Sequence, residues 1–134
     1  MTDQELMALA EKASENAYVP YSHFKVGAAL LCRDGSVYCG CNIENAAYGA
    51  VMCAERTALF SAVADGKRDF LKIAVCGGKD DTSVPCPPCG ICRQALREFC
   101  DDAFGILMKD GDGLLSATMC ELLPLSFQKN RLEK

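Results

Sequence analysis

Four cysteines and one carboxylate in two short stretches are the residues of this chain best suited to chemistry. The first stretch is Cys53-Ala54-Glu55-Arg56, and the second runs from Pro85 to Gln94 with cysteines at 86, 89 and 92. One cysteine from the first and two from the second would give zinc three protein ligands. The fourth position would be left to water, as in a catalytic zinc site. A carboxylate two residues after the first ligand could move the protons of that water, so the pattern predicts zinc-dependent hydrolytic chemistry.

The prolines of the second stretch indicate which of its cysteines share a helix. Pro88 forces an extended conformation on the residue before it, so Cys86 cannot share the helix that follows. Cys89 and Cys92 then fall on the first turn of that helix, on one face, where the partial positive charge of the helix start favours thiolates. We predict Cys53, Cys89 and Cys92 as the ligands of one zinc ion per subunit. Cys86 would be a nearby free thiol, or a ligand in a minority arrangement.

The charged residues beside the ligands receive roles in this hypothesis. Three thiolates weaken the ability of a zinc dication to acidify water, so a positive group should lie close to them. Arg56 and Arg93 are the candidates, and we expect Arg56 to hydrogen-bond a ligand sulfur and compensate its charge. Glu55 is the only acidic residue between Asn45 and Asp65. An ordinary surface glutamate is the alternative, but its place beside Cys53 predicts a catalytic proton carrier.

Hydrophobic periodicity predicts helices and strands in the segments that must position these residues. Helices are expected over residues 3–18, 53–64 and 89–100 and, after a Thr118–Glu121 capping box, before Pro124. Strands are expected over residues 24–33, 36–42, 70–77, 103–108 and 114–118. Because residues 70–108 alternate strand, helix and strand, we expect a right-handed crossover and a parallel strand pair. Residues 1–134 are therefore predicted to form a single α/β domain, with a mixed five-stranded sheet covered by helices.

Two connections carry expectations of their own. Asp34-Gly35 predicts a type I′ turn between the first two strands. The loop over residues 43–52 has neither periodicity, and a loop of that length is more often functional than accidental. Its small residues would also permit close approach of another subunit. His23, the only histidine, lies in a turn and is not predicted to be a ligand.

Charge and cysteine content restrict the partners and the compartment. The net charge is −4 and no basic patch is evident, so no nucleic acid polymer is expected as substrate or partner. No apolar run is long enough to cross a membrane, and the first residues are acidic where a signal peptide would be basic. Ten cysteines in such a chain indicate reduced thiols and metal ligands, hence a cytoplasmic protein. The six outside the two stretches are predicted to be small buried hydrophobes: Cys32, Cys39, Cys41, Cys76, Cys100 and Cys120.

Several longer segments resemble the cytidine deaminase family, in its small homotetrameric branch with cysteine ligands. They are Tyr21 to Ala29, Gly40 to Tyr48, Cys53 to Ala58 and Pro88 to Gln94, with a weaker match at Glu121 to Pro124 and Phe127. The resemblance implies a three-layer α/β/α sandwich. It also implies zinc-dependent deamination of cytidine and 2′-deoxycytidine to the uridines with release of ammonia, a step of pyrimidine salvage.

The same resemblance implies roles in binding the nucleoside. Phe24 would pack on the pyrimidine, and the Ala54 backbone would contact the base. Asn42 and Glu44 would hydrogen-bond the sugar hydroxyls, and burying such polar groups without that partner would be costly.

Further implied contacts cross between subunits. Tyr48 and Phe127 would complete sites in neighbouring copies of a homotetramer, so the expected partners are a small-molecule nucleoside and other copies of this chain.

Two alternatives remain open at this point. A zinc deaminase acting on a nucleoside-like antibiotic such as blasticidin S would share both cysteine stretches, although the segment from Asn42 to Asn45 favours an ordinary nucleoside. A structural zinc module would close its site with a fourth cysteine, Cys86, and leave no position for water. The residues Val84 to Pro87 depart from the family pattern and put the shape of that loop in question.

Overall fold

The computed structural model describes residues 1–133, and its centre is a five-stranded sheet with strand order β2-β1-β3-β4-β5. The strands are β1 (Lys25–Cys32), β2 (Val37–Cys41), β3 (Phe70–Gly78), β4 (Gly105–Asp110) and β5 (Gly113–Thr118). β3 and β4 pair in parallel, while the other neighbours are antiparallel. The mixed sheet and its parallel pair are therefore confirmed.

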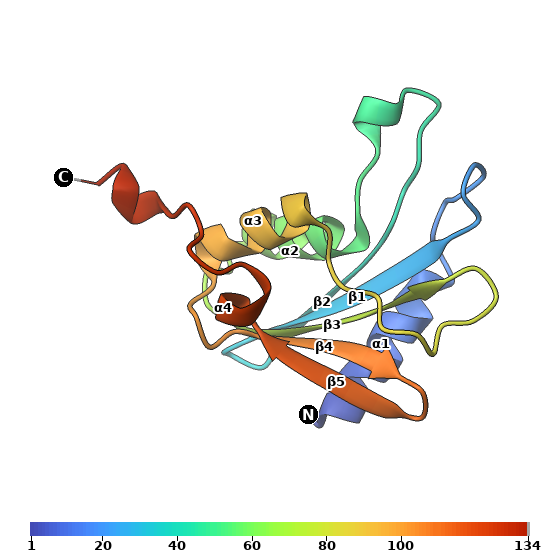
Figure 1. Ribbon diagram of the computed structural model, residues 1–134, viewed down its shortest axis with the longest axis horizontal. Coiled ribbons are helices and arrows are strands. Elements are labelled where there is room, and N and C mark those ends of the chain that lie inside the picture. The colour runs from blue at the N-terminus through green and yellow to red at the C-terminus, as the bar shows by residue number, and fades with distance from the viewer. Residues whose placement is uncertain (134) are drawn as a thin grey trace.

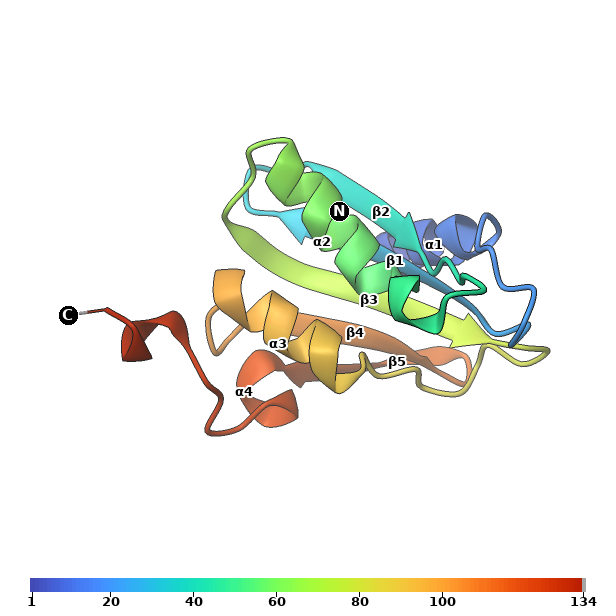
Figure 2. The same cartoon turned by 90° about the horizontal axis from the view of Figure 1, so that it is seen from above.

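Helices cover both faces of this sheet. The helix α1 (Asp3–Ser14) lies on one face, and α2 (Ala54–Ala64) and α3 (Gly90–Phe99) lie side by side on the other (Figures 1 and 2). Successive strand residues point to opposite faces. Along β1, Ala28 and Leu30 join the core beneath α2 and α3, while Ala29 and Leu31 join the core beneath α1. The three-layer α/β/α sandwich is confirmed.

A glycine in the edge strand sets the position of α2. A Cβ built on Gly40 of β2 would lie 2.5 Å from the Ala54 carbonyl oxygen and 2.5 Å from the Ala58 nitrogen. Only glycine permits such close contact between the strand and the backbone of the helix. The first turn of α2, which carries Glu55, therefore rests directly on β2.

The first helix is shorter than predicted, because Tyr18 forms backbone hydrogen bonds with the chain that follows β2. α1 ends at Ser14 instead of residue 18. The Tyr18 nitrogen donates to the Asn42 carbonyl oxygen at 3.0 Å, and the Tyr18 carbonyl oxygen accepts from the Glu44 nitrogen at 2.8 Å. This bridge satisfies the Tyr18 backbone in place of helical hydrogen bonds.

The first hairpin turn also differs from the prediction. Of Asp34 and Gly35, only Gly35 has a positive φ, of 93°, whereas a type I′ turn requires two. The Gly35 nitrogen donates to the Cys32 carbonyl oxygen at 3.0 Å, and the Cys32 nitrogen donates to the Ser36 carbonyl oxygen at 2.8 Å. The connection is a type I turn followed by a glycine bulge. The Asp34 carboxylate favours it by accepting from the Ser36 nitrogen at 2.9 Å.

The prediction that six cysteines are buried is right for three and wrong for three. Cys32, Cys76 and Cys100 are buried, whereas Cys39 and Cys120 are exposed and Cys41 is half-buried. Cys39 pairs with Ala29 on the α1 face of the sheet, but β2 is the edge strand. Its apolar side chains therefore lack the cover that central strands receive.

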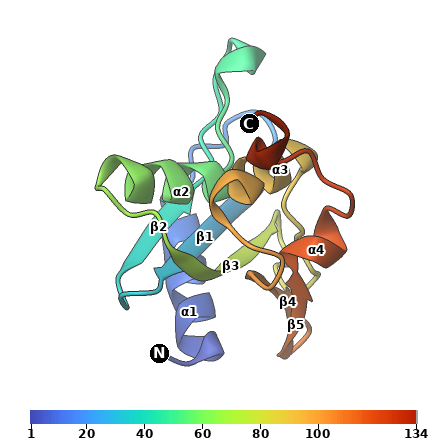
Figure 3. The same cartoon turned by 90° about the vertical axis from the view of Figure 1, so that its left-hand side faces the viewer.

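Two segments extend away from the sandwich. The first, which we call the finger, comprises residues 43–52, with mutual backbone hydrogen bonds of 2.9 Å between Ile43 and Met52 at its base and η1 (Tyr48–Ala50) at its tip (Figures 1 and 3). The second, the tail, comprises residues 123–133. It follows α4 (Met119–Leu122), whose predicted capping box is present, and includes η2 (Lys129–Arg131). Within residues 1–133, no helix combines the length and apolar character needed to cross a membrane.

Candidate active site

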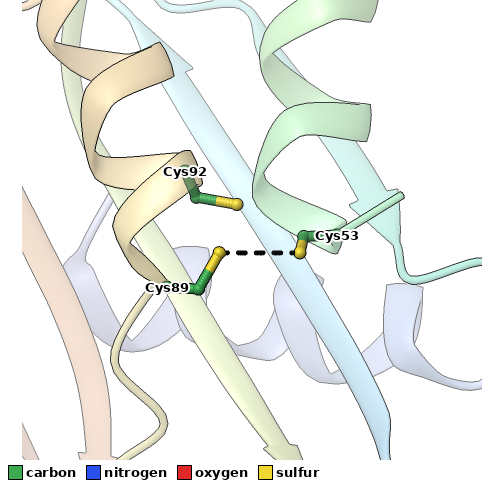
Figure 4. A group of neighbouring side chains, drawn as sticks. All are labelled: Cys53, Cys89 and Cys92. Carbon is green, nitrogen blue, oxygen red and sulfur yellow. Dashed lines mark hydrogen bonds between the residues drawn. The ribbon is translucent and has the colours of Figure 1, made fainter. Parts of the chain in front are cut away.

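Three cysteine thiols meet where the N-termini of α2 and α3 converge. Cys53 and Cys89 are the residues just before these helices, and Cys92 lies in the first turn of α3. Their sulfur atoms all lie within 4.8 Å of one another, and those of Cys53 and Cys89 are 3.8 Å apart (Figure 4). Three thiols from two helix starts are a donor set suited to zinc, because the partial positive charges there stabilise thiolates.

Cys86 lies outside this thiol cluster. Its sulfur packs over the end of β3, 3.1 Å from where a Cβ on Gly77 would lie, and burial raises the pKa of its thiol to about 11. The potential metal-binding group found within residues 1–133 contains three cysteines and not four. The geometry thus gives no support to closure of the site by Cys86.

Arg56 contacts this cluster. Its Nη2 donates to the Cys53 sulfur at 3.4 Å. The hydrogen bond from Cys92, aided by Arg56, lowers the pKa of the Cys53 thiol to about 5, while the same Cys53–Cys92 contact raises the pKa of Cys92. The Arg56 Nε is buried and finds no hydrogen-bond partner among the described residues. A buried donor left unpaired is costly, and the positive charge of the same guanidinium lies beside the Cys53 sulfur.

Arg93, the other candidate for charge compensation, has different partners. Its Nε donates to the Pro88 carbonyl oxygen at 2.8 Å, and its Nη1 donates to the Leu122 carbonyl oxygen at 2.7 Å. The guanidinium therefore joins two backbone segments.

Glu55 lies in the first turn of α2 and is only 4% exposed. Its burial raises the pKa of the carboxyl to about 7, and the nearby charge of Cys53 acts in the same direction. A carboxyl whose pKa lies near neutrality can both accept and release a proton.

A cleft of about 270 Å³ opens onto Glu55 and the thiols of Cys53 and Cys89, and Cys86 lines it as well. Of the predicted substrate-binding residues, Asn42, Glu44 and Ala54 line it. Its apolar wall includes Val26, Ile43, Val51 and Met52. The last three belong to the loop over residues 43–52, which was expected to be functional, whereas Val26 was not predicted. Val26 lies near the start of the predicted strand over residues 24–33, a position that could have indicated it.

The polar residues of the cleft also hold the chain around Phe24. Asn42 accepts from the Val26 nitrogen at 2.9 Å and donates to the Phe24 carbonyl oxygen at 2.8 Å. The Glu44 Oε1 accepts from the nitrogens of Tyr21 and Ser22 at 3.0 and 3.1 Å. Hydrogen bonding to Ser22 lowers the pKa of Glu44, so this carboxylate is an acceptor at neutral pH.

The remaining predicted substrate-binding residues do not line this cleft. Phe24 is 40% exposed, Tyr48 at the finger tip is 77% exposed, and Phe127 in the tail is 61% exposed. Phe127 is held through its carbonyl oxygen, which accepts from the Gln94 Nε2 at 2.9 Å. One chain therefore assembles the thiols, Glu55 and part of the cleft, and leaves three aromatic rings outside.

A three-layer α/β sandwich with thiols at two helix starts, beside a buried glutamate, defines the class of zinc-dependent deaminases. The chain belongs to the family described as "cytidine and deoxycytidylate deaminase zinc-binding region", whose model matches residues 1–108. The thiol cluster lies within the matched region, and the cofactor is accordingly a zinc ion.

Several named proteins are similar over nearly their whole length. The cytidine deaminase of Sporosarcina psychrophila is 49% identical over 133 residues, covering 98% of this chain and 96% of that protein. The cytidine deaminase of Halalkalibacterium halodurans is 51% identical over 128 residues, covering 95% of each. The blasticidin-S deaminase of Bacillus cereus is 31% identical over 134 residues, covering 95% of each.

The fold is also that of a solved relative. The crystal structure of cytidine deaminase from Burkholderia pseudomallei matches with a TM-score of 0.87 and 47% identity, covering 95% of this chain and all of that one.

Proposed function

We propose that this chain is a zinc-dependent cytidine deaminase, which converts cytidine and 2′-deoxycytidine to the corresponding uridines and releases ammonia. The observation that carries the proposal is the buried Glu55 beside three convergent thiols, two of which line the same cleft as Glu55. The two relatives near 50% identity, both cytidine deaminases, support the same substrate.

The residues of this chain divide the chemistry between them. Cys53, Cys89 and Cys92 would hold zinc, which when bound supplies the Lewis acidity that turns water into a nucleophile at neutral pH. Glu55 takes one proton from the attacking water and delivers it to ring nitrogen N3. It delivers the second to the amine, which leaves as ammonia, while the oxygen becomes the C4 carbonyl. A pKa near neutrality suits a group that must both accept and donate.

Substrate orientation falls to the polar residues at the end of β2. The Asn42 Nδ2 has a second hydrogen, and Glu44 has a second oxygen, Oε2, beyond the contacts that hold the Phe24 segment. These atoms suit the two hydroxyls of a sugar, and the Ala54 backbone lines the same cleft.

A homotetramer with shared sites is part of this proposal. Phe24, Tyr48 and Phe127 are exposed in a single chain, and the latter two lie on segments that extend away from the sandwich. Burying such rings against neighbouring copies would complete the cleft and remove apolar surface from water. Light scattering during size-exclusion chromatography should give four times the mass of the chain.

The setting of the reaction is proposed as well. Residues 1–134 would form one catalytic domain, acting in pyrimidine salvage in the cytoplasm. All ten cysteines are free thiols in the structure, as is expected in a reducing compartment.

Ammonia release tests the proposal directly. Zinc-replete protein should release ammonia from cytidine, and protein stripped by a chelator should not until zinc is restored. Blasticidin S serves as the second substrate, because a relative with 31% identity is named blasticidin-S deaminase. Ammonia release from blasticidin S alone would show that the antibiotic is the substrate in place of cytidine. If a folded, zinc-loaded protein releases ammonia from neither compound, the proposal is wrong.

A further inference from the structure

The guanidinium of Arg93 lies between the thiol cluster and the C-terminal part of the chain. Its two hydrogen bonds, of 2.8 and 2.7 Å, reach the carbonyl oxygens of Pro88 and Leu122. Pro88 directly precedes Cys89, and Leu122 is the last residue of α4. Arg93 thus joins a segment that carries a thiol to the end of α4, at a residue 29 positions after Arg93 itself.

The chain that leads to Pro88 has no helix or strand to hold it, whereas the Cys89 carbonyl oxygen accepts from the Arg93 nitrogen at 2.9 Å at the start of α3. β3 ends at Gly78 and α3 begins at Gly90, and no helix or strand lies between them. Pro88 is fully buried but has no amide hydrogen to donate, so its carbonyl is its only backbone group for hydrogen bonding. The planar, always charged fork of arginine holds two acceptors in fixed directions, which a lysine cannot do.

We propose that Arg93 is a positioning residue, which fixes the Cys89 sulfur by holding the Pro88 carbonyl against the end of α4. The C-terminal part of the chain then contributes to metal retention although none of its residues belongs to the thiol cluster. This inference rests on the zinc site of the proposed function.

Two neighbours on α3 provide matched controls. Arg97 donates to the Ser126 Oγ at 3.0 Å and pairs with Asp102, and Gln94 donates to the Phe127 carbonyl oxygen at 2.9 Å. Both side chains hold the same C-terminal part of the chain. Neither forms a hydrogen bond to the Pro88–Cys89 segment among the described residues, so their removal loosens the tail without freeing Cys89.

The experiment measures the rate at which zinc passes from the purified holoprotein to a colorimetric chelator, together with the thermal midpoint. Arg93→Ala should release zinc at least ~10-fold faster than the unmodified protein, a change worth about 1.4 kcal/mol. Arg93→Lys should fall between them. Arg97→Ala should lower the thermal midpoint at least as much as Arg93→Ala does, and Gln94→Ala should lower it only slightly. Both of these control variants should release zinc at the rate of the unmodified protein.

Each outcome is decisive. If Arg93→Ala releases zinc at the rate of the unmodified protein, the inference is wrong. It is also wrong if Arg97→Ala releases zinc faster to the same degree as its thermal midpoint falls. If Arg93→Ala does not fold, the comparison of Arg93→Lys with Arg97→Lys decides in the same way. A folded unmodified protein that retains no zinc would instead contradict the proposed function.

Discussion

The thiol cluster and the finger differ in how much of the chain packs around them. At the cluster, two helix starts bring three sulfurs within 4.8 Å of one another, over a buried glutamate. At the finger, a ten-residue loop is held by backbone hydrogen bonds at its base, and the ring at its tip is 77% exposed. The residues that would react are preorganised by the sandwich, whereas the rings that would enclose the substrate are left exposed.

The contrast shows how the two tasks depend on different contacts. Proton transfer and metal binding require groups held within fractions of an ångström, which packed helices provide. Enclosing a nucleoside requires only that aromatic surface arrive from outside, and another copy of the chain can supply it. Metal retention should therefore be a property of the single chain, and catalytic efficiency a property of the assembly.

The largest effect is expected from Glu55→Gln. The amide keeps the shape of the side chain but carries no proton between water and substrate, so kcat should fall by at least ~10³-fold. The zinc content, measured by metal analysis, should stay unchanged, because Glu55 is not a predicted ligand. An active, zinc-loaded variant would remove Glu55 from the mechanism.

Two glycine substitutions test the difference in rigidity. Gly40→Ala places a Cβ 2.5 Å from backbone atoms of α2, so α2 must shift, and the free energy of unfolding should fall by about 3 kcal/mol with loss of zinc affinity. Gly49→Ala in the finger meets nothing within 4 Å in its own chain and should change the free energy of unfolding of that chain by less than ~0.5 kcal/mol. Denaturant unfolding measures both. Equal effects would show that the finger is as tightly packed as the cluster.

The exposed rings should affect assembly and efficiency but not metal binding. Tyr48→Ala and Phe127→Ala should each reduce kcat/KM by about 10-fold, the loss of roughly 1.4 kcal/mol of binding energy. Zinc content should remain that of the unmodified protein. Steady-state kinetics over a range of protein concentrations checks this, and full efficiency in both variants would contradict a shared site.

Cys86→Ala should leave the metal site unchanged. Because its sulfur packs over Gly77 outside the cluster, zinc should still bind with one ion per chain and three protected thiols. The lost packing should cost less than ~2 kcal/mol of stability. A loss of zinc would instead make Cys86 a ligand.

Patterns local in sequence were enough to predict most of the fold. The strand candidates on either side of Asp34-Gly35, the continuous apolar strand at 70–77 and the capping box at Thr118 each predict an element that the structure contains. The prolines before Cys89 separate it from Cys86, and the sulfur positions agree with that separation.

The misses arise from contacts between distant residues. Tyr18 lies outside the first helix because its backbone forms a β-bridge with Ile43. Cys39 is exposed because β2 is the edge strand, and strand order cannot be seen from periodicity. Arg93 and Arg56 look equivalent beside their cysteines, yet only the folded chain shows that one reaches a sulfur and the other two carbonyls.

The separation of Cys53 and Cys89 along the chain has a consequence for folding. The two residues lie 36 positions apart, on helices that meet only in the folded protein. An ion held by both acts as a cross-link that closes this loop, and by the entropy of loop closure such a link is worth about 4 kcal/mol against unfolding. A disulfide would offer a similar restraint, but reducing agents would cleave it. The metal centre is therefore also a cross-link that stabilises the fold and that reducing conditions leave intact.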